Sequence, residues 1–321
     1  MDKPLTSLSL DLDDLWTYLK THGHPGWKEF PSYLSYAVPR ILDILDEWGL
    51  KITFFLVAQD AVFPRNHAVL KAIADRGHEI GNHTFHHDPW LHLYSEMEID
   101  SELALAEEHI ERVTGKLPAG FRGPGFSFSE TVLQVLAQRG YAYDGSTFPN
   151  ILNPLARMYF LWSSNMDKEE RKQREGLFGS WRDGLRPNKA FHWEWEGKKM
   201  LEIPVTTLPL FKVPIHASYI LFLSTFNYSL AMAYLRLAMR LCRLSGTPPS
   251  LLLHPLDFLG KDDTDALSFF PAMRVERGPK IKVMHAIFRE LTQHYRPVPM
   301  IEYARSLTEK HALKSRPIPA V

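Results

Sequence analysis

The chain has 321 residues, of which 45% are hydrophobic, so it is long enough and apolar enough to bury a substantial core. Lysine plus arginine and aspartate plus glutamate each total 37, and this zero net charge argues against a protein that binds nucleic acid through many phosphate contacts. Cys242 is the only cysteine, which excludes an internal disulfide and a thiolate metal cluster.

The amino-terminal residues lack the basic start, apolar stretch and small-residue cleavage site of a signal peptide, so we expect a cytoplasmic protein. The longest charge-free run lies between Lys212 and Arg236. It contains several polar residues and is therefore a poor candidate for a membrane span.

Strand-like and helix-like segments alternate along the first half of the chain. Strands are predicted by apolar alternation or β-branched and aromatic runs at 7–14, 51–59, 78–83, 119–125 and 141–146. Between them, helices are predicted by helical periodicity, capping residues and terminal glycines at 36–48, 66–77, 95–115 and 129–140. This rhythm predicts parallel βα units and an α/β fold, either closed as a barrel or left open as a sheet.

The rhythm breaks at about 148–198, which mixes apolar and highly charged stretches. We interpret this segment as an insertion that covers or borders the site of a single catalytic domain formed by residues 1–321. Regular segments return with a strand at 199–210, a helix at 229–246, a buried strand at 250–258 and two closing segments at 280–295 and 298–310.

Polar side chains recur where the predicted strands end. They are Asp11, Asp13, His83, Arg122 and Asp144. Because the carboxyl ends of parallel strands share one edge, where ligands bind in such folds, we expect these side chains to form one site.

Two histidines and two aspartates in this set suggest a metal. His83 and His87 have the i, i+4 spacing that places two imidazoles on one side of a helical turn. Asp11 and Asp13 lie on one face of the first strand, so one can bind the cation while the other accepts a proton. Two imidazoles and a carboxylate suit Zn²⁺ and some other divalent ions.

The remaining strand ends offer partners for hydrolysis. Arg122 could keep an aspartate ionised, and the turn at Pro124, Gly125 and Phe126 could direct backbone N–H groups at an oxyanion. His254 is a candidate general acid for the leaving group, with Asp144 available to orient it.

In this order, the motifs resemble those of the polysaccharide deacetylases, the NodB-homology group of carbohydrate esterases. The motifs are Asp11-Leu12-Asp13, TFFLV (53–57), GHEIGNHTFHH (77–87), FRGPGFS (121–127), YDGST (143–147) and LLLHP (251–255). The resemblance covers roughly residues 7–147 and 199–306. It implies a distorted barrel of about seven parallel strands and metal-dependent hydrolysis of an N-acyl group, acetyl or formyl, on an amino sugar.

The resemblance also implies roles for individual residues. The implied metal ligands are Asp13, His83 and His87. The implied catalytic residues are the base Asp11, its positioning partner Arg122, the general acid His254 and its partner Asp144. Zn²⁺ is the expected ion, with Co²⁺, Mn²⁺ and Ni²⁺ as alternatives.

The first motif departs from the family pattern of two adjacent aspartates followed by glycine. Asp14 could replace Asp13 as the metal carboxylate, although strand alternation favours Asp13. The Asp-x-Asp motif and the expected intracellular setting are similar to a branch that deformylates a lipid-linked amino sugar and to branches that open small cyclic amides.

The substrate therefore stays open between a glycan, a lipid-linked sugar and a small cyclic amide or ureide. A non-catalytic sugar-binding protein of the same fold is a further alternative. Peripheral contact with the inner face of a membrane is a hypothesis that rests on the basic stripe at Arg236, Arg240 and Arg243 and on the apolar part of the insertion.

Overall fold

A sheet of mostly parallel strands runs through the protein, whose computed structural model describes residues 3–153, 158, 181–310 and 313–318. In these residues ten strands pair in the order β10-β6-β7-β5-β4-β3-β2-β1-β8, and β9 pairs with β1. The strands are β1 (Leu5–Leu12), β2 (Thr53–Leu56), β3 (Glu79–Asn82), β4 (Gly120–Phe121), β5 (Tyr143–Asp144), β6 (Phe191–Trp195), β7 (Lys198–Glu202), β8 (Leu251–Leu253), β9 (Arg296–Val298) and β10 (Ser315–Pro317).

β1 lies inside the sheet and is buried along its length after Leu5. It pairs in parallel with β2 from Ser9↔Thr53 onward and with β8 from Leu8↔Leu251 onward. Leu8, Leu10 and Leu12 belong to the main hydrophobic cluster, which confirms their predicted common face. Burial of both faces is expected for a parallel strand that is covered by helices.

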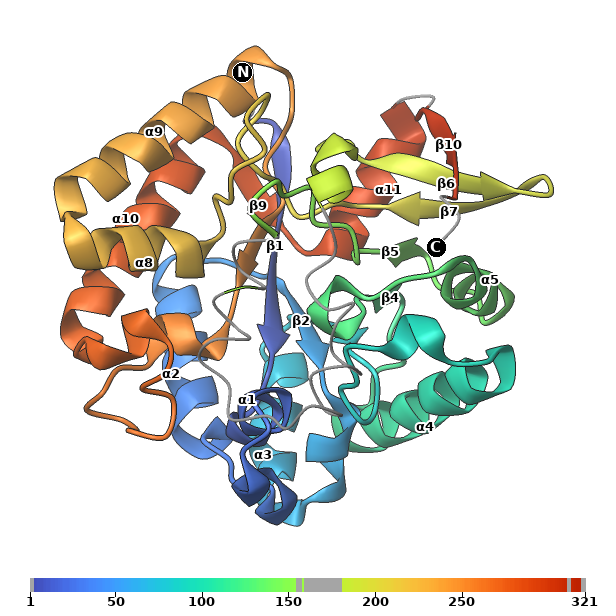
Figure 1. Cartoon of the computed structure of the whole chain (residues 1–321), viewed down its shortest axis with the longest axis horizontal. Helices are drawn as coiled ribbons and strands as arrows, with labels where there is room; N and C mark the ends of the chain where they lie inside the picture. The colour runs from blue at the N-terminus through green and yellow to red at the C-terminus, as the bar shows by residue number, and fades with distance from the viewer. Residues whose placement is uncertain (1–2, 154–157, 159–180, 311–312, 319–321) are drawn as a thin grey trace.

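Helices lie around the outside of the strands, as Figure 1 shows. They are α1 (Leu15–Thr21), α2 (Leu34–Glu47), α3 (Pro64–Asp75), α4 (Glu96–Thr114), α5 (Glu130–Gln138), α8 (Ala217–Phe226), α9 (Tyr228–Leu244), α10 (Arg277–His294) and α11 (Met300–Lys310). The helices predicted in the first half of the chain and at 229–246 are confirmed within a few residues. In α4, for example, Ser95 and Glu98 form a capping box, and Gly115 ends the helix at φ 69°.

The α/β class with parallel strands is confirmed, but its details differ from the prediction. Ten strands are present in the described part of the chain instead of about seven, and their pairings run from β10 to β8 without closing a ring. The predicted strand at 250–258 is regular only as β8, because Pro255 starts a 3₁₀ turn over Pro255–Phe258.

Part of the predicted insertion is a β-hairpin. β6 pairs antiparallel with β7, and Glu196 and Gly197 connect them with positive φ angles of 46° and 76°. Such a two-residue connection is typical of tight hairpins. Residues 154–157 and 159–180 of the predicted insertion lie outside the described residues.

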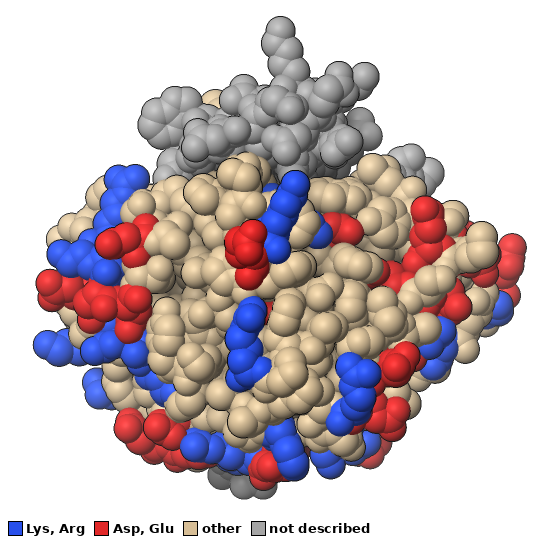
Figure 2. All heavy atoms as spheres, turned by 90° about the horizontal axis from the view of Figure 1, so that it is seen from below, with Lys and Arg blue, Asp and Glu red and all other residues tan. Residues whose placement is uncertain are grey.

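Charged side chains of both signs are interspersed on the face shown in Figure 2, without an extended field of one sign. This pattern agrees with the equal numbers of acidic and basic residues. Among the described helices, none is both long enough and apolar enough to cross a bilayer.

Candidate metal centre and active site

Asp13, His83 and His87 lie together beyond the carboxyl ends of β1 and β3. The Nε2 atom of His87 is 3.0 Å from Asp13 Oδ1, and Nε2 of His83 is 3.5 Å from the same oxygen. The potential ligand atoms of the three residues all lie within 4.8 Å of one another, and all three side chains are buried. The structure thus brings together the three side chains that the sequence predicted as metal ligands.

The two histidines converge by a route that differs from the prediction. Residues 83–87 form an irregular loop instead of a helical turn. Thr84 and His87 have positive φ angles of 64° and 55°, which β-branched and bulky residues rarely adopt. The i, i+4 spacing therefore pointed to the right pair of histidines, but an irregular loop and not a helical turn brings their side chains together.

The hydrogen bonds around these side chains suit a cation. His83 Nδ1 donates to the backbone oxygen of Arg122 at 2.6 Å, which leaves its Nε2 lone pair free to bind a metal. Asp13 Oδ1 is buried and, despite its short distance to His87, has no hydrogen-bond partner among the described residues. A buried carboxylate oxygen without a donor, beside two imidazole nitrogens, fits a divalent ion.

Electrostatics keep the Asp13 carboxyl ionised. Burial by itself raises the pKa of Asp13, but the neighbouring imidazoles of His87 and His83 outweigh this effect and hold the pKa well below its usual value. Asp13 therefore supplies a negative charge to the centre at neutral pH.

Asp14 has a different position and role. Its Oδ1 accepts hydrogen bonds from the backbone N–H groups of Leu15 at 2.7 Å and Tyr33 at 2.9 Å, so it caps α1 and ties it to the start of α2. Of the two adjacent aspartates, Asp13 is the one beside the histidines.

Asp11 forms a buried ion pair with Arg122. Arg122 is fully buried, and its Nη1 lies 2.6 Å from Asp11 Oδ1. The guanidinium also donates to Ser9 Oγ at 2.9 Å and to the backbone oxygen of Gly145 at 3.0 Å. Arg122 therefore holds one oxygen of the Asp11 carboxylate from the end of β4.

Asp144 lies at the predicted strand end but has other partners than predicted. Its Oδ1 accepts hydrogen bonds from the N–H and the hydroxyl of Ser146, and burial raises its pKa. Glu202, its register neighbour on β7, is likewise fully buried. Within the described residues no hydrogen bond joins Asp144 to His254, so the expected pairing of these two residues is not found.

His254 is instead connected to Asp257 through Ser218. The Ser218 hydroxyl donates to Asp257 Oδ1 at 2.7 Å and lies 3.1 Å from His254 Nδ1. Because a hydroxyl has a single proton to donate, its oxygen accepts from Nδ1–H of His254, and Nε2 takes no part in this contact. The sequence analysis missed Ser218, which lies on α8. Asp257 could have been linked to His254 from the sequence, because it lies three residues after His254. In the structure its Oδ2 accepts the His254 N–H at 2.8 Å.

A cavity of about 830 Å³ adjoins His254 and is lined mainly by apolar and aromatic side chains. Its walls include Phe126, Phe148, Tyr219, Phe222, Leu256 and Phe270. The predicted oxyanion turn also lines it, but the Phe126 N–H donates to the oxygen of Gly123 and Pro124 has no N–H. Gly125 is therefore the remaining backbone donor of the three.

Comparison with known proteins agrees with this geometry. Residues 19–143 match the family model for polysaccharide deacetylase. A structure from Mycobacterium smegmatis, named as a candidate polysaccharide deacetylase, superposes with a TM-score of 0.59 at 17% identity, over 100% of this chain and 96% of the other, and so shares the fold. Residues 19–143 of the chain are thus similar to the polysaccharide deacetylase family.

Curated relatives are similar over part of the chain. A peptidoglycan deacetylase from Helicobacter pylori is 28% identical over 47% of this chain and 52% of its own length. A peptidoglycan-N-acetylglucosamine deacetylase from Bacillus cereus is 36% identical over 32% and 36%, and a chitin deacetylase from Pestalotiopsis sp is 33% identical over 32% and 34%. The chain thus spans about half or less of the length of these relatives.

Proposed function

We propose that this protein is a metal-dependent hydrolase that removes an acetyl or formyl group from the nitrogen of an amino sugar. The observation that carries the proposal is the cluster of Asp13, His83 and His87 beside the Asp11–Arg122 ion pair. The names of the relatives support removal of an N-acetyl group from sugars.

Asp13, His83 and His87 would hold the cation, and their two nitrogens and one oxygen suit Zn²⁺, with Co²⁺, Mn²⁺ or Ni²⁺ as alternatives. Bound there, a divalent ion would polarise the acyl carbonyl and acidify a water molecule. The protein's own residues supply the proton transfers.

Asp11 is placed to accept a proton from the attacking water, since Arg122 holds its carboxylate in one orientation. His254 is placed to donate a proton from Nε2 to the departing amine, and Ser218 fixes the ring through Nδ1. The N–H of Gly125 is available to the carbonyl oxygen as it becomes negative. The net reaction adds water across the amide and yields a free amine and a carboxylate.

The cavity favours a substrate with an apolar part. His254 lines it while the residues of the metal cluster do not, so the amine side of the substrate would occupy it. Phe222 lines the cavity, and the centre of its ring lies 5.1 Å from the centre of the Phe226 ring. Phe226 is 75% exposed. An apolar surface thus continues outward from the cavity, which supports a lipid-linked amino sugar over a small cyclic amide.

Exposed apolar side chains support peripheral contact with the cytoplasmic face of a membrane. Phe226 and Leu230 at the α8–α9 junction are exposed, and so are Leu210 and Phe211 in the segment before α8. Of the predicted basic stripe, Arg236 pairs with Glu290 at 3.2 Å. We therefore propose that the apolar residues, more than the arginines, make this contact.

The test is an assay of acetate and formate release by the metal-loaded protein. The substrates are N-acetyl and N-formyl glucosamine, chito-oligomers, long-chain alkyl glycosides of the acylated sugars and a cyclic ureide. We expect metal-dependent release that is fastest with the alkyl glycosides and that is lost in the Asp11→Asn variant. Opening of the ureide with no release from any acylated sugar would favour the cyclic-amide alternative, and binding of sugars without turnover would favour the non-catalytic one.

A further inference from the structure

The loop that carries both histidines, residues 83–87, belongs to no helix or strand. It begins with His83 directly after β3 and ends with His87, with positive φ angles at Thr84 and His87. Positive φ costs free energy for residues other than glycine, so the surrounding contacts must impose this conformation.

The hydrogen bonds of the loop's backbone N–H groups identify the contacts that impose this conformation. His83 N–H donates to the oxygen of Leu56, Thr84 N–H to Asn82 Oδ1, and His87 N–H to Thr84 Oγ1. The two N–H groups in the middle, those of Phe85 and His86, both donate to one carboxylate oxygen, Oε1 of Glu102, at 2.9 Å and 2.6 Å.

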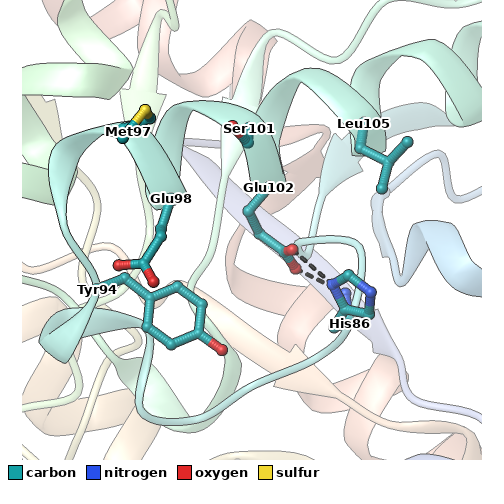
Figure 3. Close-up of a pocket in the computed structure, with 7 residues that line it drawn as sticks. All are labelled: His86, Tyr94, Met97, Glu98, Ser101, Glu102 and Leu105. Atoms are coloured by element: carbon teal, nitrogen blue, oxygen red, sulfur yellow. Dashed lines mark hydrogen bonds and ion pairs between the residues drawn. The ribbon is translucent and has the colours of Figure 1, made fainter.

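Glu102 reaches the loop from the middle of α4. Its side chain is buried, and its second oxygen, Oε2, accepts from His86 Nδ1 at 2.7 Å. Figure 3 shows the carboxylate directed at His86, while Glu98, one turn earlier on the same helix, lies beside Tyr94. Glu98 bonds to Ser95 and caps the helix. Glu98 and Glu102 thus line one pocket but have different hydrogen-bond partners.

We propose that Glu102 is a positioning residue for the metal centre, because its carboxylate holds the backbone between the two imidazole ligands. A carboxylate suits this place since it accepts three donors without offering one that would repel them. The inference rests on the metal site of the proposed function and is independent of the substrate.

Removal of the carboxylate leaves two N–H groups of the loop without an acceptor in a largely buried setting. The loop then relaxes toward ordinary backbone angles, and the Nε2 atoms of His83 and His87 lose their common target. Groups that orient metal ligands typically contribute about 10–100-fold to metal affinity, so we expect an effect of this size.

The experiment measures Zn²⁺ and Co²⁺ affinity by titration calorimetry and the visible spectrum of the Co²⁺ form. We expect Glu102→Ala and Glu102→Asp to bind about 10–100-fold more weakly, the latter because its carboxylate is one methylene too short. Glu102→Gln keeps an oxygen for both N–H groups and should recover most of the affinity. His86→Ala keeps both N–H donors and should bind within about threefold of wild type.

Glu98→Ala is the matched control, because it removes a carboxylate from the same helix and pocket. It should lower thermal stability through the helix cap and leave metal affinity unchanged. Glu102→Asp keeps the proposal testable if Glu102→Ala does not fold. Wild-type affinity in a folded Glu102→Ala or Glu102→Asp variant would overturn the proposal, whereas a wild-type protein that binds no metal would instead overturn the proposed function.

Discussion

At the scale of single residues, Asp13 and Asp14 are adjacent carboxylates whose side chains point in different directions and therefore have different partners. Asp13 faces the two imidazoles, where contact with them lowers its pKa. Asp14 faces away and accepts backbone N–H groups, and its burial raises its pKa to about 6. One carboxylate is therefore suited to a cation, and the other to joining two helices.

This difference predicts opposite outcomes for matched alanine variants. Asp13→Ala should lose at least about 100-fold in metal affinity, because the only anionic ligand is removed. Asp14→Ala should keep its metal and lose about 1–3 kcal/mol of unfolding free energy, because Leu15 and Tyr33 lose their acceptor. Metal content after dialysis and urea unfolding measure the two effects. Loss of metal in Asp14→Ala alone would reverse the assignment.

At the scale of elements, the close approach of β2 and β3 supports the buried ion pair of Asp11 and Arg122. Gly81 is the register partner of Phe55, and a Cβ atom at Gly81 would lie 2.5 Å from the Phe55 ring. The Arg122 guanidinium lies 4.4 Å from the centre of that ring on its way to Asp11. The glycine therefore allows the packing on which Arg122 depends.

We expect Gly81→Ala to displace the Phe55 ring, to cost about 1–3 kcal/mol of stability and to lower kcat/KM by about 10-fold or more. Gly115→Ala is the control, because its φ of 69° makes alanine cost about 1 kcal/mol far from the site, with no atom within 4 Å. Both variants are assayed metal-loaded at a temperature where they are folded. Equal losses of activity in the two variants would contradict this account.

At the scale of the whole molecule, several buried histidines are held neutral. His78 accepts the Ile52 N–H on Nδ1 at 3.2 Å, and burial lowers its pKa to about 4. Burial likewise lowers the pKa of His22 to about 4 and that of His216 to about 3. Below pH 6.5 these imidazoles bind protons in the unfolded chain, whereas in the folded protein they stay neutral down to about pH 4. Stability contributed by these groups is therefore lost as the pH falls from 6.5 to 4.

The contribution of His78 to the free energy of unfolding should thus decrease between about pH 6.5 and 4.5. His78→Asn retains an acceptor for the Ile52 N–H but cannot be protonated, so its decrease should be smaller than that of the wild type. Urea unfolding at several pH values measures both slopes. Identical slopes would show that His78 does not contribute.

The sequence predicted much of the site because parallel strands place their carboxyl ends at one edge. Asp11, Asp13, His83 and Arg122 could be found from that rule alone, and the structure brings them together. Ser218 could not, since α8 was not recognised in a long charge-free run and its contact with His254 depends on tertiary packing. Likewise, Thr84 has a backbone conformation that its own sequence disfavours, and the contacts of the loop with Asn82 and Glu102 help to impose it.

The position of β1 between β2 and β8 has a consequence for biosynthesis. Every ligand atom of the metal cluster belongs to the first 87 residues, whereas β8 and His254 arrive more than 160 residues later. A chain emerging from the ribosome therefore presents the three residues that we propose to hold the ion well before the residue that we propose to protonate the leaving group. If the proposed function holds, a nascent protein in which β8 has not yet paired with β1 would bind an ion before it could complete the reaction.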